Sequence, residues 1–283
     1  MPAPALRVHR SKIIYGTASD VTNHDPAHLL NLARRTAREA GDLAAELRAG
    51  GIDVASTKSN RLDIVTQADT AVETLIRTRL RSARPDDGFL GEEGDPSEGT
   101  SGITWVVDPI DGTVNYLYGS PYYAVSIAAT VREPDGGRRA LAGCVLAPEL
   151  GVEYTATADG PAVRNGQELR LGDPAPLADA LVATGFPYDL GRRERVVRVM
   201  ARLAPLIRDF RLNGAASLEL CGVAEGRLDA FLLWDLPVWD YAAAALVATR
   251  AGARVRGGTD SPRTPLLLAA QPALAASITP HLT

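Results

Sequence analysis

The feature that most constrains this chain is an apolar, β-rich run at residues 103–107 that leads directly into the segment D-P-I-D-G-T (108–113). Such a run indicates a buried strand. Proline has no N–H for a sheet, so Pro109 predicts that the strand ends at Asp108, and the Asp-Gly pair predicts a turn. The carboxylates of Asp108 and Asp111 are therefore expected to face one space at a sheet edge.

Two further acidic segments stand at the ends of predicted elements. The segment G-E-E-G (91–94) follows Phe89-Leu90, which is expected to end a strand, and Asp240 opens a predicted Ala-rich helix over residues 240–251. Each piece alone has a plainer interpretation, because an Asp-Gly pair is usually only a turn, an Asp before a helix a cap and a Glu pair a solvated loop. Together with the strand ending in D-P-I-D-G-T, they favour a functional site.

The residue types at these segments indicate a magnesium site. Carboxylates, the Ile110 carbonyl and water are hard oxygen ligands, which suit Mg²⁺ better than zinc or copper. The four histidines lie away from these segments, at positions 9, 24, 28 and 281. Gly112 allows backbone N–H groups to approach an anion closely, as in other phosphate-binding turns.

The N-terminal part of the chain predicts two helices. Asp25 as N-cap and Pro26 at the first position open a helix that Gly50-Gly51 ends. A second helix is expected to begin near Asp69, with Thr70 and Glu73 at the spacing of a capping box. A short strand over 62–66 lies between them, and residues 1–24 are interpreted as an N-terminal extension.

The rest of the chain alternates strands and helices. Apolar segments near 124–131, 140–146 and 152–157, separated by turns, predict an antiparallel meander that continues through Asn165-Gly166. Helices are expected over 194–207 and 215–225, with strands near 228–233, 255 and 266–269. Helices and sheets in alternation indicate an α+β or α/β fold with layers packed on one another.

Composition excludes several classes of protein. The chain is 46% hydrophobic and 23% charged, without an apolar run that would span a membrane. Its start lacks the apolar core of a signal peptide, and Cys144 and Cys221 are too few for a disulfide framework, so we expect a cytoplasmic protein. The net charge of −4 gives no basic surface for nucleic acid.

The segments D-P-I-D-G-T (108–113) and W-D-Y-A-A (239–243) resemble the two signature motifs of the inositol monophosphatase family. Lys58, the run 63–69 and the segment 91–93 precede them in the family's order, and the similarity covers roughly residues 26–270. The resemblance implies the layered α/β/α/β/α sandwich of the sugar phosphatases, usually as a homodimer. It implies one phosphatase domain over 25–283, with an N-terminal half over about 25–175 and a C-terminal half over about 176–283.

The resemblance also implies a reaction, namely Mg²⁺-dependent hydrolysis of a small phosphate monoester by water, without a covalent intermediate. The groups expected to hold two or three Mg²⁺ ions are Glu92, Asp108, the Ile110 carbonyl, Asp111 and Asp240. The groups expected to act on the water, directly or in support, are Glu92, Thr113, Asp69, Lys58 and Glu93. The residues expected to contact the substrate are Asp111, Gly112, Thr113, Gly214, Ala215, Leu233 and Asp240.

The substrate side departs from the family pattern. Inositol-type members carry a Glu where an ungapped count reaches Leu233, and Ser or Thr where this chain has Ala215. A site that loses hydrogen-bonding groups changes its specificity, so myo-inositol 1-phosphate is expected to be a poor substrate. Trp234 or Asp235 provides a different contact in one interpretation, and Trp234 only packs in the other.

Several substrates and one other function stay open. The phosphate monoester is a sugar, cyclitol or related metabolite phosphate, or alternatively a nucleotide 3′-phosphate or histidinol phosphate, which relatives also hydrolyse. A non-catalytic binding protein is the third possibility, since some relatives also act on the transcription machinery. The complete set of predicted metal ligands argues against it. The arginines at 192, 193, 195 and 198 either meet an anionic substrate near a dimer interface or, in the plainer interpretation, form a solvated helix face.

Overall fold

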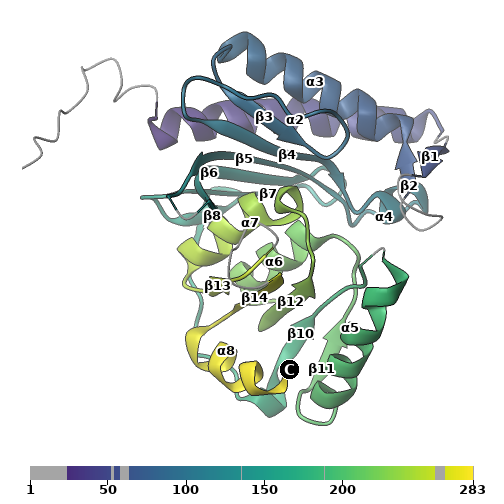
Figure 1. Ribbon diagram of the computed structural model, residues 1–283, viewed down its shortest axis with the longest axis vertical. Helices are drawn as coiled ribbons and strands as arrows, with labels where there is room; N and C mark the ends of the chain where they lie inside the picture. The colour runs from purple at the N-terminus through teal and green to yellow at the C-terminus, as the bar shows by residue number, and fades with distance from the viewer. Residues whose placement is uncertain are drawn as a thin grey trace, which may run out of the picture.

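The computed structural model describes residues 24–51, 54–57, 64–134, 136–187, 189–258 and 265–282. Helices and sheets alternate in five layers: two helices, a seven-stranded sheet, two helices, a five-stranded sheet and two helices (Figure 1). The predicted α/β/α/β/α sandwich is confirmed.

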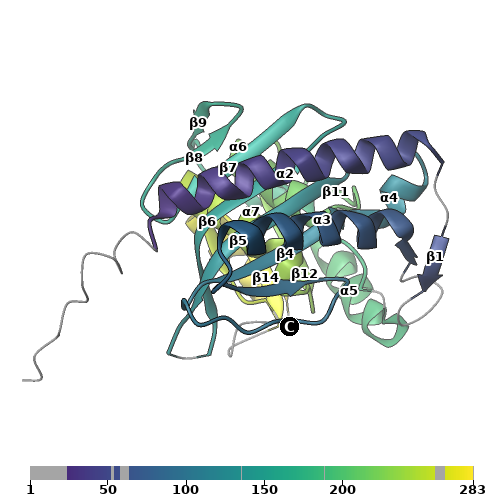
Figure 2. The same cartoon turned by 90° about the horizontal axis from the view of Figure 1, so that it is seen from above.

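Two long helices, α2 (Pro26–Ala49) and α3 (Gln67–Ala83), form the first layer and run side by side over the seven-stranded sheet (Figure 2). The start of α2 is as predicted: Pro26 is its first residue and the Asp25 side chain accepts a hydrogen bond from Ala27 N at 3.0 Å. The capping box predicted at residue 70 is wrong. The helix α3 already begins at Gln67, so Thr70 lies inside its first turn.

The seven-stranded sheet supplies the frame of the fold. Its strands, in spatial order, are β3 (Gly88–Gly91), β4 (Thr104–Asp111), β5 (Ala124–Arg132), β6 (Arg138–Ala147), β7 (Val152–Thr157), β8 (Ala162–Arg164) and β9 (Gln167–Leu169). Only β3 and β4 pair in parallel. Asn165-Gly166 joins β8 to β9 with positive φ at both residues, as the predicted hairpin turn requires.

The prediction that Pro109 ends the strand is wrong, because β4 continues to Asp111. Asp108 pairs with Ser126 and Asp111 with Ala124, so two residues of β4 stand opposite one residue of β5. This is a β-bulge, where a ladder N–H is not needed and proline is tolerated.

The five-stranded sheet lies below the central helices. In spatial order its strands are β11 (Asp209–Arg211), β10 (Leu181–Ala183), β12 (Ala230–Trp234), β14 (Leu266–Ala270) and β13 (Arg254–Arg256). The helices between the sheets are α6 (Ala216–Glu225) and α7 (Val238–Ala251), and those on the far face are α5 (Leu190–Leu203) and α8 (Pro272–Ile278).

Short elements complete the chain: a two-stranded ribbon of β1 (Val54–Thr57) and β2 (Ile64–Thr66), the helix α4 (Thr113–Leu117), and the 3₁₀ turns η1 (Leu177–Asp179) and η2 (Thr279–His281). Among the described helices, none has both the length and the apolar character needed to cross a bilayer.

Three apolar cores hold the layers together. Along β4, Trp105 and Val107 pack into the core under α2 and α3, whereas Val106 points to the opposite face and the central core. The central core contains side chains from both sheets, α6 and α7, so it joins residues on both sides of position 175. The division into two halves there stays a prediction. A third core lies between the five-stranded sheet and the helices α5 and α8.

Candidate active site

The bulge at the end of β4 places three predicted ligand groups in the interior. Asp108, Ile110 and Asp111 are 2%, 0% and 6% exposed. The Ile110 amide donates to Asp108 Oδ1 at 3.0 Å, which restricts rotation of this carboxylate. The apolar part of β4 is thus an anchor for acidic groups that would otherwise remain in water.

Carboxylates from three other segments act electrostatically on Asp108. Glu92 follows β3, the parallel neighbour of β4; Asp69 comes from the first turn of α3 and Asp240 from that of α7. Burial raises the pKa of Asp108 well above its usual range, and the charges of Glu92, Asp111, Asp240 and Asp69 raise it further. The carboxylates that the sequence predicts as metal ligands thus act on one another electrostatically, and their joint role as ligands stays a prediction.

The position of Asp240 differs in one respect from the prediction. The helix α7 begins at Val238 with Pro237 before it, so Asp240 lies in the first turn and is not the N-cap. An acidic side chain in a first turn is favourable in the field of the helix dipole. Pro237 is the N-cap residue, directly before the first helical residue.

Thr113 is connected to Asp69 as predicted for a supporting pair. Thr113 Oγ1 lies 3.3 Å from Asp69 Oδ1 and 3.2 Å from the Ile110 carbonyl oxygen. Asp69 is fully buried and Thr113 is 8% exposed, so little water competes for these contacts.

Asp111 has partners that the sequence did not reveal. Its Oδ1 accepts from Ala216 N at 3.1 Å, and its Oδ2 accepts from Ser217 N at 2.7 Å and from the Ser217 hydroxyl. Burial raises the pKa of Asp111 to about 6, although these hydrogen bonds lower it. Asp111 thus caps the first turn of α6 from a strand more than 100 residues away, which no local pattern could indicate.

Another buried acid supports the loop before α6. Glu219 is 1% exposed and accepts from Asn213 N at 2.6 Å. Burial raises its pKa to about 8. Asn115 of α4 donates to Asn213 O at 2.7 Å, so α4 and this loop are tied from both sides.

Gly112 lies against the predicted substrate-binding residues Gly214 and Ala215. Its φ is +92°, and a Cβ added there would lie 3.1 Å from Ala215 Cβ and 3.2 Å from Gly214 O. Only glycine suits this conformation and contact, so the start of α4 and the start of α6 meet backbone to backbone.

The third predicted substrate-side residue, Leu233, lies in β12 and is 8% exposed. Its side chain is the first that a Cβ added at Gly185 would meet, at 3.5 Å. Trp234 is 5% exposed and packs in the core beneath α5, in agreement with the packing interpretation. Asp235 directly follows the strand with φ +58°, and its Oδ1 lies 3.2 Å from Arg192 Nη1.

The donor set fits a hard divalent cation. Carboxylate and carbonyl oxygens are the groups that Mg²⁺ prefers, and Asp111 Oδ1, with one hydrogen bond, keeps a second lone pair. In the ranges that the structure describes, no three Asp, Glu, His or Cys side chains already form a compact metal site. Lys58 lies outside the described residues.

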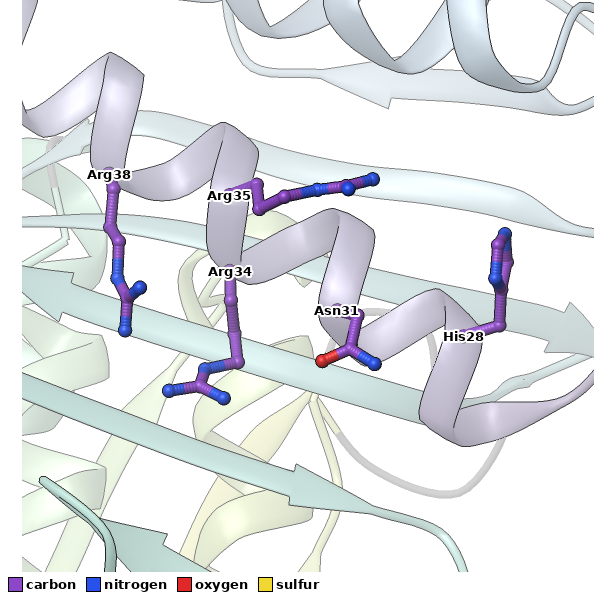
Figure 3. A pocket seen from close by; sticks show the side chains of 5 residues that line it. All are labelled: His28, Asn31, Arg34, Arg35 and Arg38. Atoms are coloured by element: carbon purple, nitrogen blue, oxygen red, sulfur yellow. The ribbon is translucent and has the colours of Figure 1, made fainter.

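A second polar region lies away from these carboxylates, on the N-terminal half of α2. A hollow of about 370 Å³ there is lined by His28, Asn31, Arg34, Arg35 and Arg38 (Figure 3). Arg34 Nη2 lies 2.6 Å and Arg38 Nε 3.0 Å from the carboxylate of Glu153, a β7 residue that is 9% exposed. This half of α2 lies at the end opposite to α4 in both views of the molecule (Figures 1 and 2).

Comparison with known proteins gives a consistent result. Residues 25–282 match the model of the inositol monophosphatase family. The chain is 43% identical over 251 residues to the inositol-1-monophosphatase SuhB of Mycobacterium tuberculosis, covering 82% of this chain and 85% of the relative. It is 38% identical over 240 residues to the Nus factor SuhB of Pseudomonas aeruginosa, covering 82% and 86%.

The fold has the same relatives. The crystal structure of the extragenic suppressor protein suhB from Bartonella henselae superposes with a TM-score of 0.83 at 30% identity, covering 90% of this chain and 98% of that one. The carboxylates around Asp108 and the signature segments at 108–113 and 239–243 thus occur on the fold that the resemblance implies. The chain belongs to the inositol monophosphatase family.

Proposed function

We propose that this chain is a Mg²⁺-dependent phosphatase that hydrolyses a small phosphate monoester with water as the nucleophile. The observation that carries the proposal is the setting of Asp108, which is 2% exposed and has the charges of Glu92, Asp111, Asp240 and Asp69 around it. Ionised carboxylates in a buried space repel one another unless cations lie between them. Members of this family are generally metal-dependent, in agreement with this charge pattern.

The proposed ligands of two or three Mg²⁺ ions are Glu92, Asp108, the Ile110 carbonyl, Asp111 and Asp240. When bound, Mg²⁺ offsets the charge of the phosphate and of the departing oxygen and lowers the pKa of water. The chain contributes ligands held in place before binding: the Ile110 amide orients Asp108, and α6 orients Asp111 through Ala216 and Ser217.

Thr113 is proposed to orient the attacking water, with Asp69 in support. The Thr113 hydroxyl has one proton, and Asp69 Oδ1 and the Ile110 oxygen are its two acceptors. While that proton is directed to either of them, the Thr113 oxygen can accept a hydrogen bond from water. A second hydrogen bond from this water to Glu92 would direct its lone pair toward phosphorus. The new O–P bond would form as the bond to the alcohol oxygen breaks; the water gives up one proton, the alcohol oxygen takes up one, and the products are the free alcohol and hydrogen phosphate. Lys58 and Glu93 keep their predicted supporting roles.

The phosphate itself is proposed to bind the backbone amides of Gly112 and Thr113. The left-handed conformation of Gly112 and its contact with Gly214 and Ala215 support this position, since they leave no room for a side chain. Asp111 and Asp240 would lie beside the bound ester, so substrate and cations share one space.

The alcohol half of the substrate is proposed to meet an apolar wall at Leu233 and Ala215. Leu233 pairs with Leu267 in the sheet, and Asp235, two residues further along the chain, is already paired with Arg192. Loss of two hydrogen bonds, one of them to a charged group, costs about 2–4 kcal/mol of transition-state binding, or about 30- to 1,000-fold in rate. We therefore propose myo-inositol 1-phosphate as a poor substrate, and expect Leu233→Glu to gain turnover of it. A high wild-type kcat/KM for this ester would overturn the proposed wall.

The experiment that tests the function is phosphate release from a panel of monoesters at saturating Mg²⁺. The panel contains inositol, sugar, nucleotide 3′- and histidinol phosphates, and each is repeated after chelation and with added Li⁺, which the family resemblance predicts to inhibit. At least one ester should be hydrolysed, and only with the metal. Full activity after exhaustive chelation would contradict the metal mechanism.

Several relatives are named Nus factor SuhB, so a second candidate function is binding to a transcription partner. The proposal keeps the chain as an enzyme without nucleic acid or membrane as partner, as a homodimer in the cytoplasm. The exposed side chains of Tyr118 and Leu212 are consistent with a subunit interface. Absence of hydrolysis across the panel, with a binding function preserved in Asp108→Asn, would favour the second candidate.

A further inference from the structure

The helix α3 carries two buried acids one turn apart, and only the first has a role in the proposed reaction. Asp69 is fully buried and Glu73 is 3% exposed. Residues four apart lie on the same face of a helix. Asp69 reaches Thr113, whereas Glu73 reaches the loop that follows β3 and carries Glu92. Building on the proposed function, we propose that Glu73 is a positioning residue that fixes Glu92 for metal binding.

Both oxygens of Glu73 bind backbone amides directly after Glu92. Glu93 N donates to Glu73 Oε2 at 2.8 Å, and Gly94 N donates to Glu73 Oε1 at 3.0 Å. Two successive N–H groups directed at one carboxylate hold the backbone in one orientation. The direction in which Glu92 leaves the chain is fixed as a result.

Arg77, one further turn along α3, completes the clamp. Its Nη2 donates to Glu73 Oε1 at 3.0 Å, its Nη1 donates to Asp95 O at 3.1 Å, and its guanidinium carbon lies 4.1 Å from the centre of the Phe89 ring. The positive charge of Arg77 balances the negative charge of Glu73. In this respect Glu73 differs from the acids that act on Asp108. Glu73 is therefore suited to hold a loop and not to bind a cation.

The two glycines that flank Glu92 and Glu93 are explained by the same contact. A Cβ added at Gly91 would lie 2.2 Å from Glu73 Oε2, and one added at Gly94 would lie 2.9 Å from Glu73 Oε1. Neither approach is possible with a side chain present. The two glycines of G-E-E-G thus leave the space that the Glu73 carboxylate occupies.

One rigid helix consequently holds both the support of Thr113 and the loop of Glu92. The spacing between Asp69, which supports Thr113, and the loop of Glu92 therefore depends on α3 and not on the loops themselves. Because a displacement of about 1 Å in a catalytic arrangement costs on the order of 100-fold, such a shared support is consequential.

The test measures Mn²⁺ binding to metal-free protein, with electron paramagnetic resonance as the readout. The Mg²⁺ dependence of phosphate release is measured alongside it. Glu73→Gln keeps the size but presents an NH₂ group to one of the two amides. We expect Mn²⁺ to bind about 10- to 100-fold more weakly, with a matching rise in the Mg²⁺ needed for half-maximal rate. The KM for the ester at saturating Mg²⁺ should change little.

The matched control is Glu153→Gln, which also removes a buried carboxylate paired with arginine, away from the site. It should lower the melting temperature and leave Mn²⁺ binding unchanged. Glu73→Asp keeps two acceptor oxygens on a shorter side chain, so its affinity for Mn²⁺ should lie between those of wild type and Glu73→Gln. It replaces Glu73→Gln in the test if that variant does not fold. Wild-type Mn²⁺ binding in both Glu73 variants would overturn the inference.

Failure of the proposed function gives a different result. If Asp108→Asn binds Mn²⁺ as wild type does, or wild type binds none, the metal site itself is wrong. If Asp108→Asn loses Mn²⁺ and the Glu73 variants do not, the metal site stands and only the positioning role falls.

Discussion

Glu153 and Asp108 are both buried acids on the seven-stranded sheet, but their surroundings are opposite. Glu153 on β7 is 9% exposed and is paired with Arg34 and Arg38 of α2, which point toward the sheet in Figure 3. Asp108 on β4 is 2% exposed, and the charged neighbours that shift its pKa most are all acids.

The difference separates a carboxylate that is balanced within the fold from one that requires something else. Arg34 and Arg38 neutralise Glu153, so its burial ties a helix to the sheet. Among the residues that the structure describes, the charged neighbours that shift the pKa of Asp108 most are acids, and the metal-free fold carries the cost of bringing these acids near one another. We therefore assign stability to Glu153 and the proposed function to Asp108. Removal of the Glu153 charge should lower the stability of the fold and leave phosphate release intact. Removal of the Asp108 charge should abolish phosphate release and stabilise the metal-free fold.

The largest expected effect comes from Asp108→Asn. Loss of a metal ligand should reduce phosphate release on the order of 1,000-fold or more, because the charge of the bound cation supplies much of the transition-state stabilisation. The same change removes a buried charge from among its acidic neighbours, so the metal-free variant should melt at a higher temperature than metal-free wild type. Phosphate release and thermal unfolding on one preparation measure both.

Asp240→Asn tests whether loss of activity and gain of metal-free stability also occur together at a proposed ligand that is only half-buried. It should abolish turnover in the same way but raise the metal-free melting temperature less. Near wild-type activity of either variant at saturating Mg²⁺ would show that the ligand assignment is wrong.

A smaller effect, of opposite kind, is expected from Glu153→Gln. Arg34 and Arg38 are 36% and 57% exposed, so they can turn to water when their partner is lost. We expect a loss of about 1–2 kcal/mol in the free energy of unfolding, below the roughly 3–5 kcal/mol of a fully buried broken pair, because both arginines are partly exposed. The kcat should remain within about twofold of wild type, as for a change away from the site. Denaturant unfolding and phosphate release check this, and a large fall in kcat would remove the distinction between the two regions.

Much of this distinction was predictable from the sequence on the acidic side. An apolar strand that leads into two aspartates is a local pattern, and Asp108 and Asp111 both lie buried in β4. The end of that strand was not predictable, because the bulge that admits Pro109 depends on its pairing with β5. The strands β10 and β11 are three residues each, too short for a periodic signal.

The supporting residues were less accessible to prediction because their partners are distant in sequence. Glu73 fits a capping box by spacing, yet its carboxylate binds amides 20 and 21 residues further along the chain. Ser217 reaches Asp111 across 106 residues, and the pairing of Glu153 with Arg34 spans 119. The pair of glycines around Glu92 was the one local sign that a carboxylate approaches this loop.

The smallest expected effect concerns pH, and it sharpens the comparison because the Asp108 region is proposed to bind cations and the Glu153 region is not. The folded-state pKa of Asp111 is about 6, above its ordinary value of 3.8, so the metal-free fold holds a proton more strongly than the unfolded chain does. That contribution to stability is present below about pH 4 and is lost as pH rises through about 6. In the proposed function Mg²⁺ replaces the proton as the partner of the carboxylates, so Mg²⁺ should raise the melting temperature more at pH 8 than at pH 5. The difference should be a few degrees, since about 1 kcal/mol corresponds to about 2–4 °C at this chain length.

Glu219, whose pKa is raised to about 8, titrates in an overlapping range, but it is not a proposed ligand. Its contribution cancels when melting temperatures with and without Mg²⁺ are subtracted. Glu153→Gln should keep the pH dependence of the Mg²⁺ effect, and Asp108→Asn should lose most of it. An equal rise at both pH values in wild type would mean that the acids near Asp108 do not bind the cation in place of protons.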